Sequence, residues 1–419
     1  MSSLSSKLDI TTVVLWMLLV AAGLVAIYST THGAAAELYT STPRQNFDRQ
    51  VMWLGISLVA VIAVLMLPIR FFQLAAFPAY ALTILLLLAA LVFGREINGA
   101  KAWLAFGPVQ FQVSEFAKVG TVLALAQLVG MRRPKTMGLS VGLSIVGIAM
   151  LPAVIILLQN DTGTALVFLG LIPIVLFWSG LGFDILLLML APAVAGYLSV
   201  VHLPSAVAFS LAFAALMWWR TRDKRVAGLA ALFAGGTTAV ASFAMAKLLQ
   251  PYQLARVLSF TDPGAAEFRD NAGFHQLQSM AAIGSGGLAG KGFLEGTQTQ
   301  GAYVPEQSTD FIFSVIGEEF GFVGAVLLLV FFLALLIRLL TLGARMKHPF
   351  GVMAAAGAAG IYLIHMFVNI GMATSMLPVI GIPLPFVSYG GSALLANSVL
   401  LAIVVSLHMR RDDFSIYGY

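Results

Sequence analysis

Apolar segments of about 20 residues recur along the whole chain, and this recurrence limits the fold more than any other feature. The hydrocarbon core of a bilayer is about 30 Å thick, and an α-helix of about 20 residues crosses it. About 12 such segments are predicted, at residues 11–31, 50–68, 75–94, 113–131, 139–158, 164–181, 184–201, 205–220, 226–248, 311–340, 351–376 and 389–408. The sequence therefore predicts an all-α polytopic membrane protein that forms a single integral membrane domain over residues 1–419.

The composition agrees with this class and excludes several kinds of site. Hydrophobic residues make up 60% of the chain and charged residues only 10%, far from the balance found in soluble domains. The chain has no cysteine, which excludes disulfides and thiolate metal sites, and its six histidines are scattered rather than grouped as ligands. A metal ion would therefore need oxygen ligands.

The distribution of Lys and Arg predicts the orientation in the membrane. If the N-terminus is cytoplasmic, most of the 23 basic residues fall into turns on that side, as is typical of inner loops. The first segment superficially resembles a signal peptide, but its length of about 20 residues favours an uncleaved span. Both termini are therefore expected in the cytoplasm, and the net charge of +5 reflects this bias rather than nucleic-acid binding.

One loop, residues 249–309, is too long to be a simple connector between spans. It contains apolar runs such as FHQLQSMAAIG and is not enriched in charge, so we expect it to be ordered. The predicted orientation makes it a large extracytoplasmic loop. A long ordered loop at the membrane surface is expected to carry part of the function.

Charged side chains inside predicted spans are costly and are therefore candidates for function. Glu115 and Lys118 are three residues apart, so they share a helix face and can neutralise each other, either as a structural ion pair or beside a site. Glu318 and Glu319 lie about 20 residues, or about 30 Å of helix, outward from Arg338, which places them at the outer edge of the membrane. Adjacent helical positions point about 100° apart, so we do not expect both glutamates to face one ligand.

The large loop and the last segment between spans carry further polar candidates. Carboxylates in a cleft can act as general bases and cations can hold a pyrophosphate, although each such residue alone is more often a solvated loop charge. The stretch GSGGLAGKG (284–292) offers backbone N–H groups but does not have the spacing of a phosphate-binding loop. The segment LPVIGIPLPFVSYGG (377–391) interrupts the helical pattern, and irregular backbone at membrane depth requires a cavity or surrounding protein. We expect this segment to face an outer cleft.

Five segments, in order along the chain, resemble the RodA/FtsW/SpoVE family, the SEDS proteins of bacterial shape, elongation, division and sporulation. They are NGAKAWLAFGPVQFQVSEFAKV (98–119), QNDTGTALV (159–167), AGFHQLQSMAAIGSGGLAGKGFLEGTQTQ (272–300), VPEQSTDFIFSVIGEEFGFVG (304–324) and NIGMATSMLPVIGIPLPFVSYGGSA (369–393). The block that ends in Ser-Tyr-Gly-Gly-Ser is the most specific. The stretches GSGG, GTQTQ and PEQSTDFIF are more similar to the elongation branch, RodA, than to the division branch.

The resemblance implies a peptidoglycan glycosyltransferase that polymerises lipid II at the outer face of the bacterial cytoplasmic membrane, for cell elongation and rod shape. It implies a class B penicillin-binding protein as partner, which crosslinks the glycan strands. In this reaction a sugar 4-hydroxyl displaces a lipid pyrophosphate from an anomeric carbon, which calls for a carboxylate base and for a cationic clamp or a divalent metal, Mg²⁺ or Mn²⁺, on the leaving group.

The resemblance also implies the site. The first choice for the base is Asp270, in RDNAGFH, where the matching family pattern has its key aspartate; Asp262, in SFTDP, is the alternative. The matching stretch is two residues shorter than the family pattern and has Phe274 in place of tyrosine. The implied substrate-binding residues are Trp103, Glu115, Lys118, Arg256, Gln278, Ser279, Lys291, Glu306, Thr309, Asp310, Glu318, Glu319, Ser388, Tyr389, Gly390 and Gly391.

Two departures from the family pattern stand out, and two rival functions remain. Ala102 stands before Trp103 where the family usually has arginine, and the chain has an additional helix pair near residues 204–248 beyond the ten spans typical of the family. One rival function is a flippase that moves the same lipid, which would place polar residues along a path at the membrane midplane. The other is a non-catalytic membrane scaffold for a penicillin-binding protein, in which the loop carboxylates would be dispensable.

Overall fold

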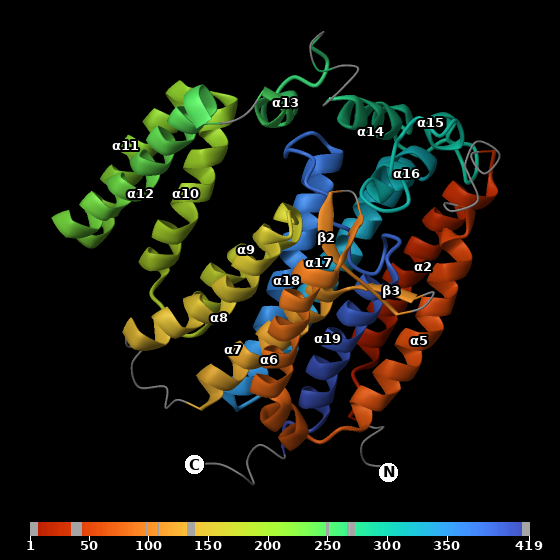
Figure 1. The fold of residues 1–419 in the computed structure, drawn as a ribbon, viewed down its shortest axis with the longest axis horizontal. Helices are drawn as coiled ribbons and strands as arrows, with labels where there is room; N and C mark the ends of the chain where they lie inside the picture. The colour runs from red at the N-terminus through yellow and green to blue at the C-terminus, as the bar shows by residue number, and fades with distance from the viewer. Residues whose placement is uncertain are drawn as a thin grey trace. The chain divides into compact units, whose positions relative to one another are not determined.

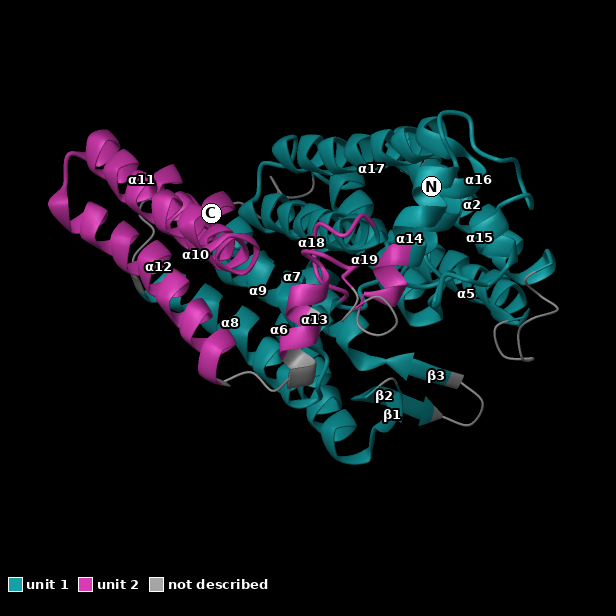
Figure 2. Cartoon of the chain, turned by 90° about the horizontal axis from the view of Figure 1, so that it is seen from above, with its two compact units in different colours: residues 1–175, 278–373, 380–419 teal, residues 176–277, 374–379 magenta. Residues whose placement is uncertain are grey.

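The computed structural model describes residues 7–34, 44–97, 99–106, 109–131, 139–248, 251–265, 268 and 273–412. By their internal contacts these residues divide into two units, shown in Figure 2. Unit 1 comprises residues 1–175, 278–373 and 380–419, and unit 2 comprises residues 176–277 and 374–379.

Unit 1, teal in Figure 2, contains most of the long helices that Figure 1 labels. They are α2 (Ile10–His32), α5 (Asn46–Met66), α6 (Ile69–Phe93), α7 (Val113–Gly130), α8 (Leu139–Leu158), α17 (Gly321–Ala344), α18 (Pro349–Ala373) and α19 (Gly391–Met409), together with most of α9 (Thr162–Trp178) and the short helices α15 (Thr297–Gln300) and α16 (Ile312–Glu319). Within the described residues of the whole chain, eleven helices are long and apolar enough to cross a membrane, and α9 is apolar but shorter. The predicted all-α polytopic membrane fold is confirmed.

The burial pattern of unit 1 is that of a membrane protein, with polar groups inside. In α5 the buried residues are Gln50 and Ser57, while apolar side chains such as Val59 and Ile62 are exposed. Helices α7, α18 and α19 are the most deeply buried, and α7 packs against α6 and α18 (Figure 1). Lipid tails are as apolar as these exposed side chains, so small and polar residues can take the interior positions.

Both ends of the described chain meet in unit 1. Lys7 Nζ lies 2.7 Å from Asp412 Oδ2, and Arg338 pairs with Asp9. The residues that flank the first and last spans therefore lie on one side of the unit.

A small antiparallel sheet stands where the sequence predicted only a loop between two spans. Its strands, β1 (Arg95–Ile97), β2 (Ala100–Phe106) and β3 (Val109–Gln112), are ordered β1-β2-β3, and Trp103 pairs with both Arg95 and Gln112. Ala102 and Leu104 alternate with more exposed residues and are buried, Leu104 in the core cluster that includes Val113 of α7. This period-two burial fixes which face of the strand turns inward and leads the chain directly into α7.

The prediction of one continuous helix over 311–340 is wrong, because the chain breaks between α16 and α17. Gly321 has φ +66°, in the left-handed region, and a Cβ there would lie 2.2 Å from the backbone nitrogen of Gly290. The glycine-rich loop caps both helix ends. The N–H groups of Lys291 and Gly292 donate to the last carbonyls of α16, and the Gly287 carbonyl accepts from Phe322 N in the first turn of α17.

Unit 2 is built around a helical bundle of α10 (Phe183–Val201), α11 (Leu203–Thr221) and α12 (Lys224–Phe243), followed by a π-helical turn at Ala244–Leu248 and by α13 (Pro251–Ser259). Small residues such as Ala195 and Ala234 let the three helices approach closely, and Ser210 shares a hydrogen bond of 3.2 Å with Thr238 inside the bundle. Helices α11 and α12 cover the predicted pair at 204–248. That this pair is an addition to the family's fold stays a prediction.

Candidate active site

The segment between α18 and α19 is bound to the loop that precedes α16. Ser388 Oγ donates to the carbonyl oxygen of Thr309 at 2.6 Å, and Tyr389 N donates to the carbonyl oxygen of Ser308 at 2.8 Å. Asn369 Nδ2 donates to the carbonyl oxygens of both Asp310 and Ile382, at 2.9 and 2.8 Å. Two motifs that lie far apart in the sequence thus meet in unit 1.

Helix α5 holds the same segment from another side. Gln50 is buried; its Nε2 donates to the Ser388 carbonyl at 3.3 Å and its Oε1 accepts from Gly390 N at 3.1 Å. Asn46, at the start of α5, donates to Ser308 Oγ at 3.1 Å. Gly391 begins α19 with no room for a side chain, since a Cβ would lie 2.1 Å from Trp53 Nε1. The Ser-Tyr-Gly-Gly block is therefore fixed mainly through its backbone.

Asp310 is the carboxylate of this region whose pKa is raised to near neutral pH. Its side chain keeps some contact with solvent but is surrounded by protein, and this burial, reinforced by the negative charge of Glu306, raises its pKa from 3.8 to about 7. Glu306 is exposed, has φ +48°, and accepts a hydrogen bond of 3.0 Å from Thr309 Oγ1. Asp310 can thus exchange a proton near neutral pH.

Glu318 fixes the loop before α15 to the end of α16. Its side chain is fully buried and accepts from Lys291 Nζ at 2.7 Å, from the backbone N–H groups of Gln298 and Thr299 at 2.8 Å each, and from Thr299 Oγ1 at 2.7 Å. Burial alone would raise the pKa of Glu318, but these hydrogen bonds, that from Lys291 first, lower it. Because α16 precedes the spanning helix α17, this charge lies outside the span.

Glu319 points to a different side of α16, as its adjacent position predicts. It accepts hydrogen bonds from Ser29 Oγ of α2 and from Gln300 Nε2, the latter at 3.2 Å. Burial raises the pKa of Glu319 despite these bonds. Both glutamates are turned into the protein, which favours a supporting role for them; direct contact with substrate stays a prediction.

The predicted pair in α7 is a buried ion pair. Lys118 Nζ lies 2.8 Å from Glu115 Oε2, and both side chains are only 2% exposed. The two groups lie one turn apart in the first half of α7, directly after β3. A pair so deeply buried provides fixed charge rather than a mobile surface contact.

The remaining predicted residues belong to other elements. Ser279 is buried in α14 (Phe274–Ser285), where its Oγ lies 2.6 Å from Ser314 Oγ and donates to the Ala373 carbonyl at 2.6 Å. Gln278 in α14 and Trp103 in β2 are partly exposed. Asp262 is exposed in unit 2, in the turn after α13. Asp270 and the side chain of Arg256 lie outside the described residues.

The described residues offer no ready metal site. In this part of the chain no three His, Asp or Glu side chains come together as metal ligands. A divalent cation would therefore need ligands from elsewhere, such as a substrate pyrophosphate, and its participation stays a prediction.

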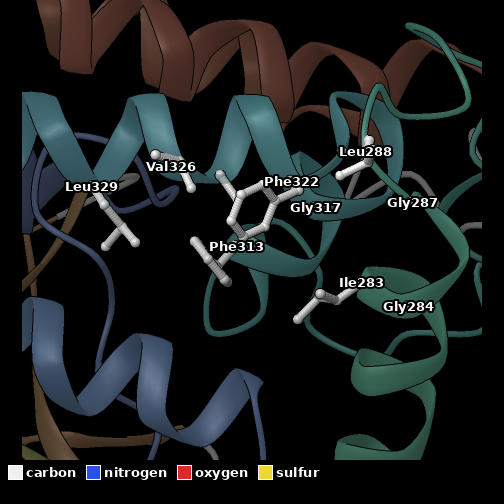
Figure 3. Close-up of a pocket in the computed structure, with 11 residues that line it drawn as sticks. Ile283, Gly284, Gly287, Leu288, Phe313, Gly317, Phe322, Val326 and Leu329 are labelled. Carbon is white, nitrogen blue, oxygen red and sulfur yellow. The ribbon is translucent and has the colours of Figure 1, made fainter.

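An apolar pocket of about 440 Å³ lies beside α16, lined by residues of α14, α16 and α17 and of the loop at 287–288. Figure 3 shows Phe313, Phe322 and Ile283 around this space. None of its eleven lining residues is charged, so it does not suit a sugar or a pyrophosphate. The polar clusters described above, rather than this pocket, are the candidate site.

Several residues that hold these clusters were missed by the sequence reasoning. Gln50, Asn369, Ser29, Gln300 and His365 are all buried and bond to predicted site residues or to their segments. Buried polar side chains within apolar spans are the signal that could have identified them.

The comparison with known sequences decides the family. A sequence profile of the FtsW/RodA/SpoVE cell cycle proteins matches residues 9–228 and 201–413, which is most of the chain. The chain belongs to the FtsW/RodA/SpoVE family. It is 34% identical over 368 residues to the peptidoglycan glycosyltransferase MrdB of Escherichia coli K12, covering 88% of this chain and 87% of that protein.

Another relative and two solved structures are similar to the chain over almost its whole length. The chain is 31% identical to the peptidoglycan glycosyltransferase RodA of Treponema pallidum, over 97% of this chain and 98% of that protein. A solved peptidoglycan synthase complex, described as coordinating polymerization and crosslinking, contains a chain with a TM-score of 0.71 and 30% identity, covering 96% of this chain and 98% of that one. The crystal structure of the rod shape determining protein RodA of Thermus thermophilus gives a TM-score of 0.62 at 29% identity, over 96% of this chain and 97% of that one.

Proposed function

We propose that this protein is a peptidoglycan glycosyltransferase of the elongation type, which polymerises lipid II into glycan strands. The observation that carries the proposal is the meeting of the Ser388 and Thr309 segments around Asp310 in a chain of this family. The family relatives that match over nearly their whole length are named peptidoglycan glycosyltransferases. No observation in the described residues favours the flippase or the scaffold.

The reaction needs a base, a bound leaving group and an ordered acceptor. The sugar 4-hydroxyl of one lipid-linked disaccharide attacks the anomeric carbon of another, the bond to the pyrophosphate breaks, and the hydroxyl proton passes to a carboxylate. Asp270 is our proposed base and Asp262 the alternative. The lipid pyrophosphate leaves as an anion that cationic groups stabilise; Lys118 and Arg256 are the proposed cations, and Mg²⁺ or Mn²⁺ would supply further charge when bound.

The clusters seen in unit 1 suit the task of positioning. Glu318 and Glu319 fix the loops around α16, and Ser388, Tyr389 and Gln50 fix the segment before α19. A site that holds two large lipid-linked substrates gains rate chiefly from such fixed geometry. These residues are proposed to shape the walls against which the substrates bind.

The proposed cellular location and the proposed partner follow from the proposed substrate. The protein is a multi-pass membrane protein, and we place it in the bacterial cytoplasmic membrane with both termini inside and the site outside. Its proposed partner is a class B penicillin-binding protein that crosslinks the strands, because a chain like this one occurs in a synthase complex that couples polymerization to crosslinking.

Polymerisation of lipid II by the purified protein tests the proposal. Wild type is compared with Asp270→Ala, Asp262→Ala and the matched control Asp48→Ala, an exposed carboxylate at the start of α5, with and without a cognate class B penicillin-binding protein and Mg²⁺ or Mn²⁺. Loss of polymer only with Asp270→Ala supports both the glycosyltransferase activity and Asp270 as its base. Loss only with Asp262→Ala moves the base upstream, and no polymer from wild type with its partner rejects the glycosyltransferase.

A further inference from the structure

A buried histidine extends the ion pair of α7. His365, in α18, is 2% exposed, and its Nε2 lies 2.9 Å from Lys118 Nζ, which also pairs with Glu115 of α7. Three polar groups from two central helices thus form one chain of contacts inside unit 1. A buried lysine needs every such partner, because an ammonium taken out of water loses its hydration.

The contacts assign the tautomer of His365. Its Nδ1 lies 2.9 Å from the carbonyl oxygen of Pro383, which can only accept, so Nδ1 carries the hydrogen. The ammonium of Lys118 can only donate, so Nε2 offers its lone pair. The ring is therefore neutral with its hydrogen on Nδ1, and it links a cation on one side to a backbone carbonyl on the other.

The carbonyl that His365 binds belongs to the segment that organises the candidate site. One helical turn further along α18, Asn369 binds the neighbouring carbonyl, that of Ile382, at 2.8 Å. The same segment continues to Ser388, which bonds to Thr309 at 2.6 Å. Hydrogen bonds, joined through the backbone of residues 382–388, thus connect the buried ammonium to the loops that surround Asp310.

We infer that His365 is a positioning residue for glycan polymerisation: it fixes the Lys118 ammonium and the 382–388 segment in one relative placement. The inference rests on the proposed function and deepens it. A buried imidazole needs a partner for each ring nitrogen, but those partners need not belong to the candidate site. Here both ring nitrogens are used, each toward a different part of the site.

Two variants separate the bonds of the ring. In His365→Gln the side-chain amide reaches the place of Nε2 and can still accept from Lys118. In His365→Asn the amide reaches the place of Nδ1, so the bond to Pro383 can persist while the acceptor for Lys118 is lost. His202→Asn, at an exposed histidine of unit 2 that bonds to Ser205, is the matched control.

Lipid II polymerisation and thermal unfolding are measured for each variant with the partner present. Displacement of a positioned group by about 1 Å can cost about 100-fold in rate, so we expect kcat to fall about 10- to 100-fold in His365→Asn with KM little changed. We expect His365→Gln to keep most of the activity at a similar Tm. Wild-type kcat in His365→Asn, or equal losses in both variants that follow a fall in Tm, would overturn the inference.

A measurement on the wild type keeps the inference testable even where variants fail to fold. Nitrogen-15 NMR of histidine-labelled protein should show a neutral ring with its hydrogen on Nδ1 and a bare Nε2. A spectrum in which every histidine ring carries hydrogen on Nε2 would reject the assignment. This readout needs no turnover, so it is independent of the test of the proposed function. The proposed function is rejected if wild type with its partner makes no polymer.

Discussion

Ser388 Oγ lies 2.6 Å from the carbonyl oxygen of Thr309, to which it donates a hydrogen bond across 79 residues of sequence. The same oxygen accepts from Leu384 N at 2.9 Å, so one buried hydroxyl satisfies a carbonyl of one loop and an N–H of another. Buried backbone groups that lose their partners cost free energy, so this hydroxyl ties the two loops into one structure.

Ser388→Ala should separate the two loops. The variant leaves the Thr309 carbonyl and the Leu384 N–H without this partner, at a cost of about 1–3 kcal/mol in the free energy of unfolding. We expect a lower Tm and a clear loss of polymerisation rate. Ser144→Ala, which removes a hydroxyl bonded to its own helix at Ser140, is the control and should leave both unchanged. Wild-type rate in Ser388→Ala would show that the loops do not depend on this bond.

Glu318→Ala should weaken the attachment of the 291–299 loop to α16. The change leaves Lys291 and the N–H groups of Gln298 and Thr299 without their acceptor. Breaking a buried pair costs about 3–5 kcal/mol, and we expect a value near the lower end because Lys291 keeps some solvent contact. Thermal unfolding in detergent measures the loss. Glu96→Ala, at an exposed glutamate of β1, is the control; a fall in Tm no larger than in this control would contradict the role.

The spans could be predicted from the sequence because hydrophobic length alone determines them, and each of the predicted segments contains a helix. The break at Gly321 was missed because it depends on contacts with Gly290, about 30 residues earlier in the chain. A glycine directly after an amphipathic turn was the available signal. The sheet at β2 was missed because its alternation is short and lies between two strongly apolar spans.

The motifs of the site could be listed from the sequence, but not which groups their side chains face. Glu318 and Glu319 were expected at the outer edge of the membrane and on different sides of their helix, but the sequence did not show that the surrounding loops and α2 bind their oxygens. Which groups these side chains face depends on tertiary contacts that no local sequence pattern encodes. His365 could be noticed as a polar residue within an apolar helix, but nothing in the sequence identifies Lys118 as its partner.

Gly321→Ala should destabilise the junction of α16 and α17. Alanine in the left-handed region costs about 1–2 kcal/mol, and the added Cβ would lie 2.2 Å from Gly290 N, so the glycine-rich loop must shift. Gly55→Ala in α5 is the matched control: a Cβ there meets no atom within 4 Å, and alanine should stabilise the helix by about 0.5–1 kcal/mol. Opposite changes in Tm are expected, and a neutral Gly321→Ala would show that the junction tolerates a straight helix.

Asp310→Asn should change how stability depends on pH. Burial raises the pKa of Asp310 from 3.8 to about 7, so between these values the folded state binds more protons at this site than the unfolded state does. This carboxyl therefore lowers the free energy of unfolding as the pH rises through that window, whereas asparagine does not titrate. We expect the Tm of the variant, relative to wild type, to rise between about pH 5 and pH 7, the upper part of that window. Asp48→Asn, an exposed carboxylate of α5, controls for the change in net charge. A difference from wild type that stays constant over this range would mean that Asp310 is ionised throughout.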